Sequence, residues 1–384
     1  MARIVAGSLA LAIATAALIF FFVVPARVDA SMNKVAAHEP YAVSREAEAL
    51  HSGLMLADLH NDVLLWDRDF LGRSARGHTD APRLAAGGYR LQVLAAVTKT
   101  PKNFNYDENA ADTDNITLLA IAQRWPFRTW SSLAERALHV ADKLKKYEKR
   151  SNGAVRLVAT REALAEGVGR DGLNVILATE GGHPLEGDLA NLDRLFEAGY
   201  RVLGLQHFFD NELGGSLHGV SGAGLTDFGR AAVAAAQRKG MIIDVAHSSE
   251  LVVEDVLAMT DAPLIVSHTG LRGHCDSPRN LSDDLMKKIA ARGGLIGVGF
   301  WDGAVCATSL EAVADAIVYG VDLVGASQVA LGSDFDGATT TPFDASEAAA
   351  LTEALMARGL GDATIRAVMG ENIIRFFAEN LPQR

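Results

Sequence analysis

The sequence has 384 residues, of which 49% are hydrophobic and 22% are charged, and its formal net charge is -11 at pH 7. This composition is typical of globular proteins and supplies enough apolar residues for one large barrel or two domains. The basic residues form no cluster, which argues against a nucleic acid as partner, because phosphate binding needs grouped Lys and Arg side chains.

The first thirty residues differ from the rest of the chain. Arg3 precedes an apolar run over 4–24, and the small-residue ending VDA stands before Ser31. This pattern predicts an export segment over 1–30, and therefore a periplasmic or extracellular protein. Because the run approaches the roughly 20 residues that span a bilayer, membrane attachment by an uncleaved anchor is the alternative to a signal peptide. Cleavage after Ala30 is the favoured interpretation.

From residue 54 onward, short apolar runs alternate with helical patterns. Continuous apolar strands separated by helices indicate a parallel sheet covered by helices. Eight such units predict a single α/β domain over 31–384, a (β/α)8 TIM barrel of the metal-dependent hydrolase type. The eight runs lie at 54–62, 89–97, 173–182, 200–208, 241–249, 263–270, 295–303 and 329–337, and helical patterns lie at 189–199, 225–240, 249–260 and 281–294.

Two helical additions flank these units. The segment 103–150 is a long insertion after the second strand, in which Pro126 is expected to break the helical pattern. The tail over 346–381 is also helical in pattern, and we expect it to pack against the outside of the barrel.

The first apolar run, LMLADLHNDVLLW at 54–66, carries Asp58, His60 and Asp62 at every second position. These side chains point the same way from a strand, and burying carboxylates without partners costs about several kcal/mol. A metal ion would satisfy them, since carboxylate oxygen and imidazole nitrogen both bind zinc. Taken alone, the pattern is more typical of a strand whose polar end enters a loop.

The other strands also end in polar residues, and the active sites of such barrels lie at the carboxyl ends of the strands. The number of candidate ligands exceeds the needs of one tetrahedral zinc, which predicts two ions with Glu180 as the bridging carboxylate. Gly181 and Gly182 would let ions and substrate approach the backbone, and Asp58 would support the ligands from one pleat deeper. The residues that end the later strands are Glu180, His207, His247, His268, Asp334 and Asp336.

Seven motifs in one order give this pattern a family resemblance. DLHND, EGGH, LGLQH, DVAHSS, VSHTG, SPRN and GSDFDG occur within residues 45–380, and together they resemble the membrane dipeptidase (renal dipeptidase) family of zinc peptidases. The resemblance implies two zinc ions per chain. It implies one ion bound by His60, Asp62 and Glu180, and the other by Glu180, His247 and His268.

The same resemblance implies the remaining roles. His207, Arg279 and Asp334 would contact substrate, and Asp334 would also handle protons beside the metals. Cys275 and Cys306, too few for a cysteine metal site, fall where the family has a disulfide. The segment GFWDGAVC lacks the tyrosine that the family places before the second cysteine, so substrate preference stays open.

These features predict a zinc-dependent dipeptidase. Two zinc ions would lower the pKa of a shared water and provide a bridging hydroxide that attacks the amide of a dipeptide, including dipeptides with a C-terminal D-residue. Glu180, His207 and Asp334 would be the catalytic residues. The alternatives are a binuclear-metal hydrolase for another substrate, such as a lactone or cyclic amide, and a binding protein that has lost turnover. The natural dipeptide is left open, as is a homodimer.

The remaining histidines lie outside the strand ends. His183 follows the third strand end without an assigned role. The others are expected in surface positions or loops, and they are His38, His51, His78, His139, His218 and His274.

Overall fold

Each of the eight apolar runs contains a strand in the computed structural model, which describes residues 2–383. Neighbouring strands pair in parallel from β2 through β3 and β5 to β10, so the predicted (β/α)8 barrel is confirmed. The strands are β2 (Leu56–Asp58), β3 (Tyr89–Val97), β5 (Leu173–Glu180), β6 (Tyr200–Gly204), β7 (Ile242–Asp244), β8 (Ile265–Thr269), β9 (Leu295–Val298) and β10 (Val329–Leu331).

The ring is nearly closed where the first and last barrel strands meet. The amide of Leu59 donates to the carbonyl of Leu331 at 2.9 Å, and the amide of Asp62 donates to the carbonyl of Phe335 at 2.9 Å. These bonds bring the DLHND and GSDFDG motifs to the same rim. A further strand, β4 (Val155–Leu157), pairs with β5 outside the ring.

Strand β3 shows why the runs are continuously apolar. Leu91 and Val93 face the barrel interior, whereas Leu94 and Ala96 pack with the residues beneath the surrounding helices. Because both faces of a barrel strand are buried, both need apolar side chains.

The covering helices bury apolar faces with helical periodicity. In α9 the N-cap Thr226 accepts a hydrogen bond from the amide of Gly229, and Ala232, Val233 and Ala236 are buried. The helices around the barrel are α3 (Arg45–Ser52), α4 (Ala81–Ala86), α7 (Arg161–Val168), α8 (Ala190–Ala198), α9 (Asp227–Arg238), α10 (Glu250–Met259), α11 (Asp283–Ala290), α12 (Asp302–Val305), α13 (Leu310–Val324), α14 (Ala349–Ala357) and α15 (Asp362–Arg366).

The insertion after β3 is less helical than its pattern suggests. Its first helix, α5 (Asn115–Ala122), begins only after the N-cap Asp114, so the preceding residues are a loop. A short turn follows Pro126, and α6 (Leu133–Arg150) then packs against the barrel. The break at Pro126 agrees with the prediction.

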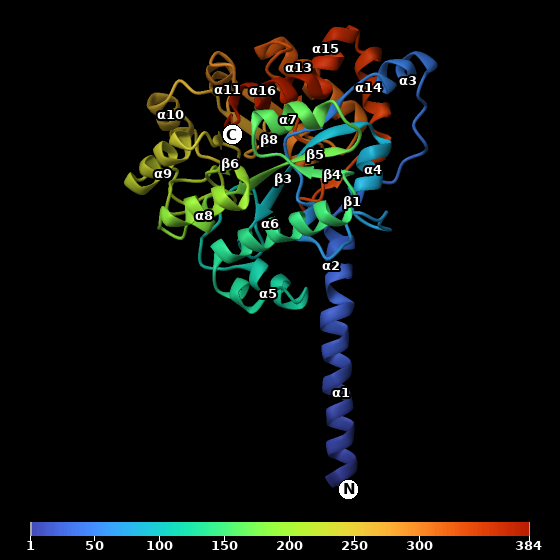
Figure 1. Ribbon diagram of the computed structural model, residues 1–384, viewed down its shortest axis with the longest axis vertical. Helices are drawn as coiled ribbons and strands as arrows, with labels where there is room; N and C mark the ends of the chain where they lie inside the picture. The colour runs from blue at the N-terminus through green and yellow to red at the C-terminus, as the bar shows by residue number, and fades with distance from the viewer. Residues whose placement is uncertain (1, 384) are drawn as a thin grey trace.

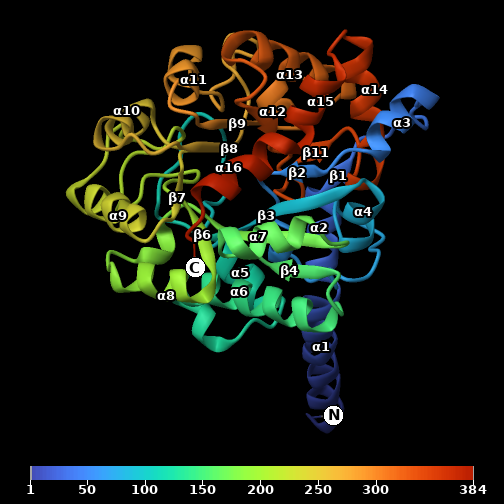
Figure 2. The same cartoon turned by 45° about the horizontal axis from the view of Figure 1, so that its top comes forward.

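The C-terminal tail meets the expectation only in part, because α14 and α15 lie around the barrel whereas its last helix does not. Its last helix, α16 (Asn372–Asn380), buries Ile373, Phe376 and Phe377 in the same cluster as the interior side chains of the strands. Figure 2 shows α16 lying across the end of the ring. This helix closes the end of the barrel opposite to the catalytic rim. Ile373, Phe376 and Phe377 fill the space that the interior side chains of the strands leave at that end.

The N-terminal segment projects from the body in Figure 1. Helix α1 (Ala2–Phe22) is continued by α2 (Val24–Met32), and β1 (Lys34–Val35) then pairs in parallel with β11 (Thr340–Thr341). The stretch from Ile4 to Met32 is long and apolar enough to cross a membrane, and the mean hydropathy of its most apolar 18 residues is 2.5.

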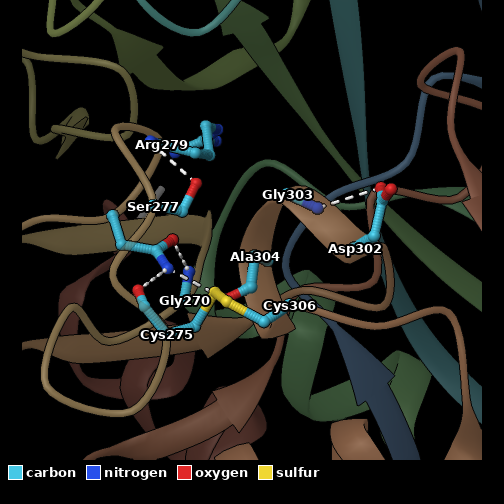
Figure 3. Close-up of a disulfide and its surroundings, with 9 residues drawn as sticks. Gly270, Cys275, Ser277, Arg279, Asp302, Gly303, Ala304 and Cys306 are labelled. Atoms are coloured by element: carbon cyan, nitrogen blue, oxygen red, sulfur yellow. Dashed lines mark hydrogen bonds between the residues drawn. A yellow bond between two sulfur atoms is a disulfide. The ribbon is translucent and has the colours of Figure 1, made fainter.

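A disulfide joins Cys275 to Cys306 and ties the loop after β8 to α12 (Figure 3). The side-chain amide of Asn280 reinforces this link by donating to the carbonyls of Cys275 and Ala304, each at 2.9 Å. Arg279 belongs to the same loop, so the bond limits how far its backbone can move.

We expect no free thiol in protein exported to an oxidising compartment. With 31 residues separating the cysteines, the chain-entropy model assigns the bond about 3–4 kcal/mol of stability. Alkylation without reductant followed by mass spectrometry tests the pairing, and denaturation of Cys306→Ser tests its stability. Two alkylatable cysteines in exported protein would contradict the prediction.

Candidate metal centre

Seven of the predicted site residues meet at the carboxyl ends of the barrel strands, where parallel strands direct their terminal side chains to one rim. Each is at most 7% exposed. Buried polar groups at this density require partners or ions. The seven residues are His60, Asp62, Glu180, His207, His247, His268 and Asp334.

Glu180, the last residue of β5, is the centre of this group. Its Oε1 atom lies 3.5 Å from Nε2 of His60 and 3.4 Å from Nε2 of His207, His247 and His268. The Nε2 atoms of His247 and His268 are 2.8 Å apart. One carboxylate oxygen therefore faces four imidazole nitrogens from the ends of four different strands, so Glu180 lies within reach of every candidate histidine ligand.

Three sets of donor atoms are close enough for an ion, each within 4.8 Å of one another. The first unites His60, Asp62 and Glu180, as the sequence predicts. His207, expected as a substrate contact, shares a second set with Glu180 and His247. The third set joins His60, His268 and Asp334. The overlap of the sets at His60 and Glu180 fits two neighbouring ions.

The charges in the site call for a cation. Burial, together with Glu180, raises the pKa of Asp62 to about 7. Burial also opposes ionisation of Glu180, but the imidazoles of His207 and His60 hold its pKa well below the usual range. Burial lowers the pKa of His60, but the neighbouring carboxylates of Asp62 and Glu180 raise it well above the usual value. A metal ion supplies the positive charge that these two carboxylates require.

The histidines are presented as ligands. Burial lowers the pKa of His207, and it lowers those of His247 and His268 well below the usual value, so the last two imidazoles are neutral. Nδ1 of His268 lies 2.9 Å from the Ser267 hydroxyl, and Nδ1 of His207 lies 3.3 Å from the carbonyl of Lys99. A hydrogen bond at Nδ1 leaves Nε2 of the same ring as the atom that can bind a metal ion.

Buried donor atoms without hydrogen bonds also mark the site. Among residues 4–383, whose side chains are described, Nε2 of His60 and Oδ1 of Asp62 have no hydrogen-bond partner. Polar atoms buried in this way are costly unless they bind something else. Their donor chemistry, imidazole nitrogen and carboxylate oxygen, suits zinc.

The backbone is strained at two of the seven residues. His247 and Asp334 have φ values of 60° and 59°, in the left-handed region that non-glycine residues rarely occupy. The turn after β10 also needs Gly337, because a Cβ there would overlap Oδ1 of Asp334 and crowd Oδ2 of Asp62. In this backbone conformation both side chains lie at the rim of the barrel.

Two predicted aspartates have supporting positions. Asp58 accepts hydrogen bonds from the amide of Ser333 at 2.8 Å and from Nε2 of Gln92 at 3.1 Å, which links β2 to the GSDFDG turn as expected of a supporting residue. Asp336, expected at the rim, instead turns away. Its carboxylate pairs with Arg68 at 2.7 Å and accepts from the hydroxyl of Thr79 at 2.6 Å.

Arg279 reaches the site from the loop after β8. It is 1% exposed, and one terminal nitrogen donates to the carbonyl of His268 at 2.8 Å. The guanidinium also lies 5.3 Å from the Trp301 ring centroid. It lines the same pocket of about 290 Å³ as Glu180 and Asp334, and the same terminal nitrogen lies 3.2 Å from Nε2 of His247.

The insertion and the N-terminal segment supply pocket residues that the sequence analysis missed. Tyr106 lines the pocket, and its hydroxyl accepts from Nε1 of Trp301 at 2.8 Å. Val28 and Met32 of α2 and Ile116 of α5 line it as well. No spacing rule links these residues to the motifs, because tertiary folding alone brings them together. Tyr106 lies on the side where the segment GFWDGAVC lacks a tyrosine.

One other expectation is wrong, and three histidines without an expected role in the site are buried. The glycines after Glu180 do not open the backbone to ligands, since a Cβ at Gly181 would meet the His183 ring and one at Gly182 would meet Leu213. His183 is buried and stacks on Phe209 at 4.5 Å between centroids. His78 and His218 lie in loops but are fully buried, because each hydrogen-bonds a backbone carbonyl in the interior.

A parallel barrel with overlapping carboxylate and imidazole clusters on its catalytic rim defines a metallohydrolase of the TIM-barrel class. The model of the membrane dipeptidase family, peptidase family M19, matches residues 44–382. The chain therefore belongs to this family, and the resemblance read from the seven motifs is confirmed.

Known proteins agree with this assignment. The chain is 30% identical to mouse Dipeptidase 3 over 237 residues, which cover 54% of this chain and 46% of the relative, so the match spans about half the relative's length. A solved dipeptidase described as a family M19 metallopeptidase is 25% identical with a TM-score of 0.73, covering 86% of this chain and 99% of its own. A Rhodobacter sphaeroides metallopeptidase, liganded with a phosphinate mimic of L-Ala-D-Ala, is 24% identical with a TM-score of 0.69 over 85% and 99% of the two chains.

Proposed function

We propose that this protein is a dipeptidase that holds two zinc ions, bridged by Glu180, and cleaves dipeptides, including those with a C-terminal D-residue. The observation that carries the proposal is the convergence of four imidazole Nε2 atoms on one Glu180 oxygen, with Arg279 in the same pocket. Membership of family M19 supports the reaction class.

We propose the ligand sets that the seven motifs imply, and the cluster of His60, Asp62 and Glu180 supports the first of them. His60 and Asp62 would hold one ion, His247 and His268 the other, and Glu180 both. Zinc held there would supply Lewis acidity and ionise a water near neutral pH.

The chain's own residues do the rest of the chemistry. His207 is buried, and its Nε2 lies 3.4 Å from Oε1 of Glu180, whose charge raises the pKa of the imidazole against the effect of burial. In the imidazolium form both ring nitrogens carry hydrogen, so Nδ1 donates to the carbonyl of Lys99 and Nε2 would donate to the oxygen of the scissile amide as charge develops there. Asp334 lies beside the ligands with a pKa raised well above its usual value by burial and then by Asp62 and Glu180. A raised pKa suits a group that accepts a proton and returns it to the leaving amine.

Arg279 would select the length of the substrate. A buried guanidinium offers a planar fork to a carboxylate, and a bidentate charged pair of this kind is worth about 1.5–3 kcal/mol. If it binds the C-terminal carboxylate, we expect space for only one residue beyond the scissile amide, because Arg279 and the ligand cluster line the same pocket. The dipeptide mimic in the Rhodobacter sphaeroides structure makes L,D pairs the first substrates to test.

Substitution of Arg279 tests the proposal. We expect Arg279→Lys to lower kcat/KM for a dipeptide by about ten-fold or more with unchanged metal content, since an ammonium cannot form the planar pair. Steady-state kinetics with L-Ala-L-Ala, L-Ala-D-Ala and their C-terminal amides measure the effect. Wild-type protein should cleave the free acids and leave the amides nearly intact.

The control for this experiment is Arg272→Lys, because Arg272 lies in the same loop but is 36% exposed and pairs with Glu250. It should leave kcat/KM unchanged. Equal cleavage of a dipeptide and its amide by the wild-type protein would contradict the carboxylate anchor. That result would favour the alternative function, hydrolysis of a lactone or cyclic amide.

We place the enzyme outside the cytoplasm. An apolar helix at the N-terminus and a disulfide support export.

A further inference from the structure

The predicted cleavage point after Ala30 lies within the folded body. Ala30 and Ser31 belong to α2, and the residues on either side of them are built into the barrel. Asp29 is 1% exposed and Asn33 is 3% exposed. A signal peptide that leaves the mature protein has no reason to be packed in this way.

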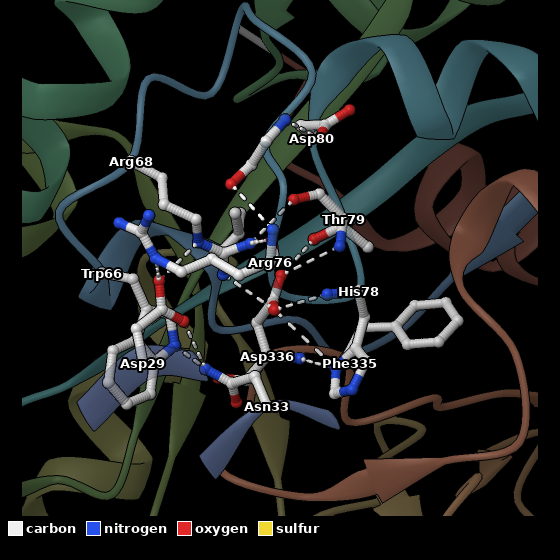
Figure 4. A network of polar contacts seen from close by, with 12 residues as sticks. Asp29, Asn33, Trp66, Arg68, Arg76, His78, Thr79, Asp80, Phe335 and Asp336 are labelled. Atoms are coloured by element: carbon white, nitrogen blue, oxygen red, sulfur yellow. Dashed lines mark hydrogen bonds and ion pairs between the residues drawn. The ribbon is translucent and has the colours of Figure 1, made fainter. Parts of the chain in front are cut away.

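Asp29 carries a buried ionic contact, as Figure 4 shows. Its Oδ2 atom lies 3.1 Å from Nε of Arg68 and 2.7 Å from Nε of Arg76, and its Oδ1 accepts from Asn33 at 2.9 Å. The Arg68 side chain is only 2% exposed. Loss of Asp29 would leave this buried guanidinium with Asp336 as its single carboxylate partner, which is strongly unfavourable.

The contact continues to the catalytic turn. Arg68 pairs with Asp336 at 2.7 Å, and Asp336 stands two residues after Asp334. Oδ1 of Asn33 accepts from the amide of Ala338 at 2.9 Å, and the amide of Lys34 donates to the carbonyl of Thr339 at 3.2 Å. Residues 29–34 thus hold the turn that carries Asp334.

Helix α2 is also a wall of the catalytic pocket. Val24, Val28 and Met32 line it together with Glu180 and Arg279. Without α2 this apolar side of the pocket would face water. An apolar wall keeps water away from the site, and electrostatic contacts are stronger where water is excluded.

Helix α1 has the properties of a bilayer span. It is 21 residues long, it is apolar on all sides, and only 6% of its most apolar window is buried. At its base, Arg124 donates to the carbonyl of Phe21 and lies 4.6 Å from the Phe22 ring centroid. Beside it, Leu118 and Phe127 are 61% and 78% exposed, which places further apolar side chains at the same end of the molecule.

We propose that the segment from α1 to β1 stays attached to the mature enzyme, with α1 as a bilayer anchor and α2 as a wall of the catalytic pocket. The retention rests on the contacts of Asp29 and Asn33, whereas the role of the wall also rests on the proposed function. In this arrangement the pocket opens beside the membrane surface, where Leu118 and Phe127 contact lipid.

Peptide mapping tests the retention without reference to activity. The full chain is expressed in an export-competent host, extracted from membranes with detergent and digested with trypsin, which cuts after Arg27 and Lys34. We expect the intact peptide 28–34, VDASMNK, at the same abundance as peptides of the barrel. Its replacement by SMNK, with the protein free of membranes, would overturn the proposal.

A substitution at Asp29 gives a second test. Asp29→Ala should lower Tm by several degrees, because it removes a partner of buried Arg68. The control Asp69→Ala removes an exposed carboxylate, 51% exposed and paired with Arg150, and should leave Tm unchanged. If cleavage removes residue 29, Asp29→Ala will have the Tm of the wild type, which would also overturn the proposal.

Labelling tests the pocket wall. Since both native cysteines are in the disulfide, Val28→Cys introduces a single thiol beside the site, and Ser52→Cys introduces one on exposed α3 as the control. A bulky maleimide should abolish dipeptide hydrolysis in Val28→Cys and spare Ser52→Cys. Full activity of the labelled Val28→Cys protein would contradict the role of α2 as a wall of the pocket. The peptide map tests the retention of α1 independently of this result.

Discussion

We expect Glu180→Ala to lose most of its bound metal and its dipeptidase activity. Removal of this carboxylate takes away the one oxygen that faces four imidazoles and leaves Asp62 as the other charged ligand. Loss of an outer partner already costs about 10–100-fold in metal affinity, so loss of the bridge should cost more. Glu180→Gln should behave similarly, because the amide keeps the volume but not the charge.

Metal analysis by inductively coupled plasma mass spectrometry gives the primary readout. Wild-type protein should carry about two zinc ions per chain, and the two variants well under one. Glu166→Gln, at an exposed position on α7, is the matched control and should keep both ions. A Glu180→Ala protein that retains two ions and full activity would exclude the bridging role.

Asp334→Asn should keep its fold and metals but lose turnover by about 100-fold or more, the usual contribution of a positioned acid-base group. The amide preserves the shape of the side chain in its strained left-handed turn. It cannot accept the proton that the reaction releases. The effect should fall on kcat, because the substrate contacts of Arg279 and His207 are unchanged.

Kinetics, metal content and Tm measured on the same preparation separate this role from a structural one. The control Asp284→Asn lies on α11 with its side chain 88% exposed, and it should match the wild type in all three. If Asp334→Asn works within a few-fold of the wild-type rate, proton transfer belongs to another group. Asp336→Asn should show the opposite result. Because Asp336 pairs with Arg68 and not with the ligands, this substitution should lower Tm more than it lowers kcat.

The agreement between predicted and observed strands has a local cause. Each strand of a closed parallel barrel is buried on both faces, so it must read as a continuous apolar run, and β3 and β5 do so over nearly their whole length. The ligands could be predicted for a related reason. A polar residue at the end of such a run, like Glu180, conflicts with its surroundings unless a functional site explains it.

The prediction for the last helix was wrong because a local pattern does not say which part of the barrel a buried face contacts. The helical periodicity of α16 states that one face is buried, but it does not state that Phe376 and Phe377 fill the end of the barrel. Cleavage after Ala30 stays a prediction from the sequence, and the retention that we propose instead rests on the ionic contact between Asp29 and Arg68, across 39 positions of sequence.

By itself, the sequence determined the barrel, the order of its strands and the residues at the carboxyl ends of those strands, because periodicity and strand-end polarity are local properties. The tertiary structure alone decided that four histidines meet at one oxygen of Glu180, that Asp336 turns to Arg68 while Asp334 faces the site, and that α2 and Tyr106 complete the pocket. These facts depend on distances between segments far apart in the chain, which packing sets and no local pattern encodes.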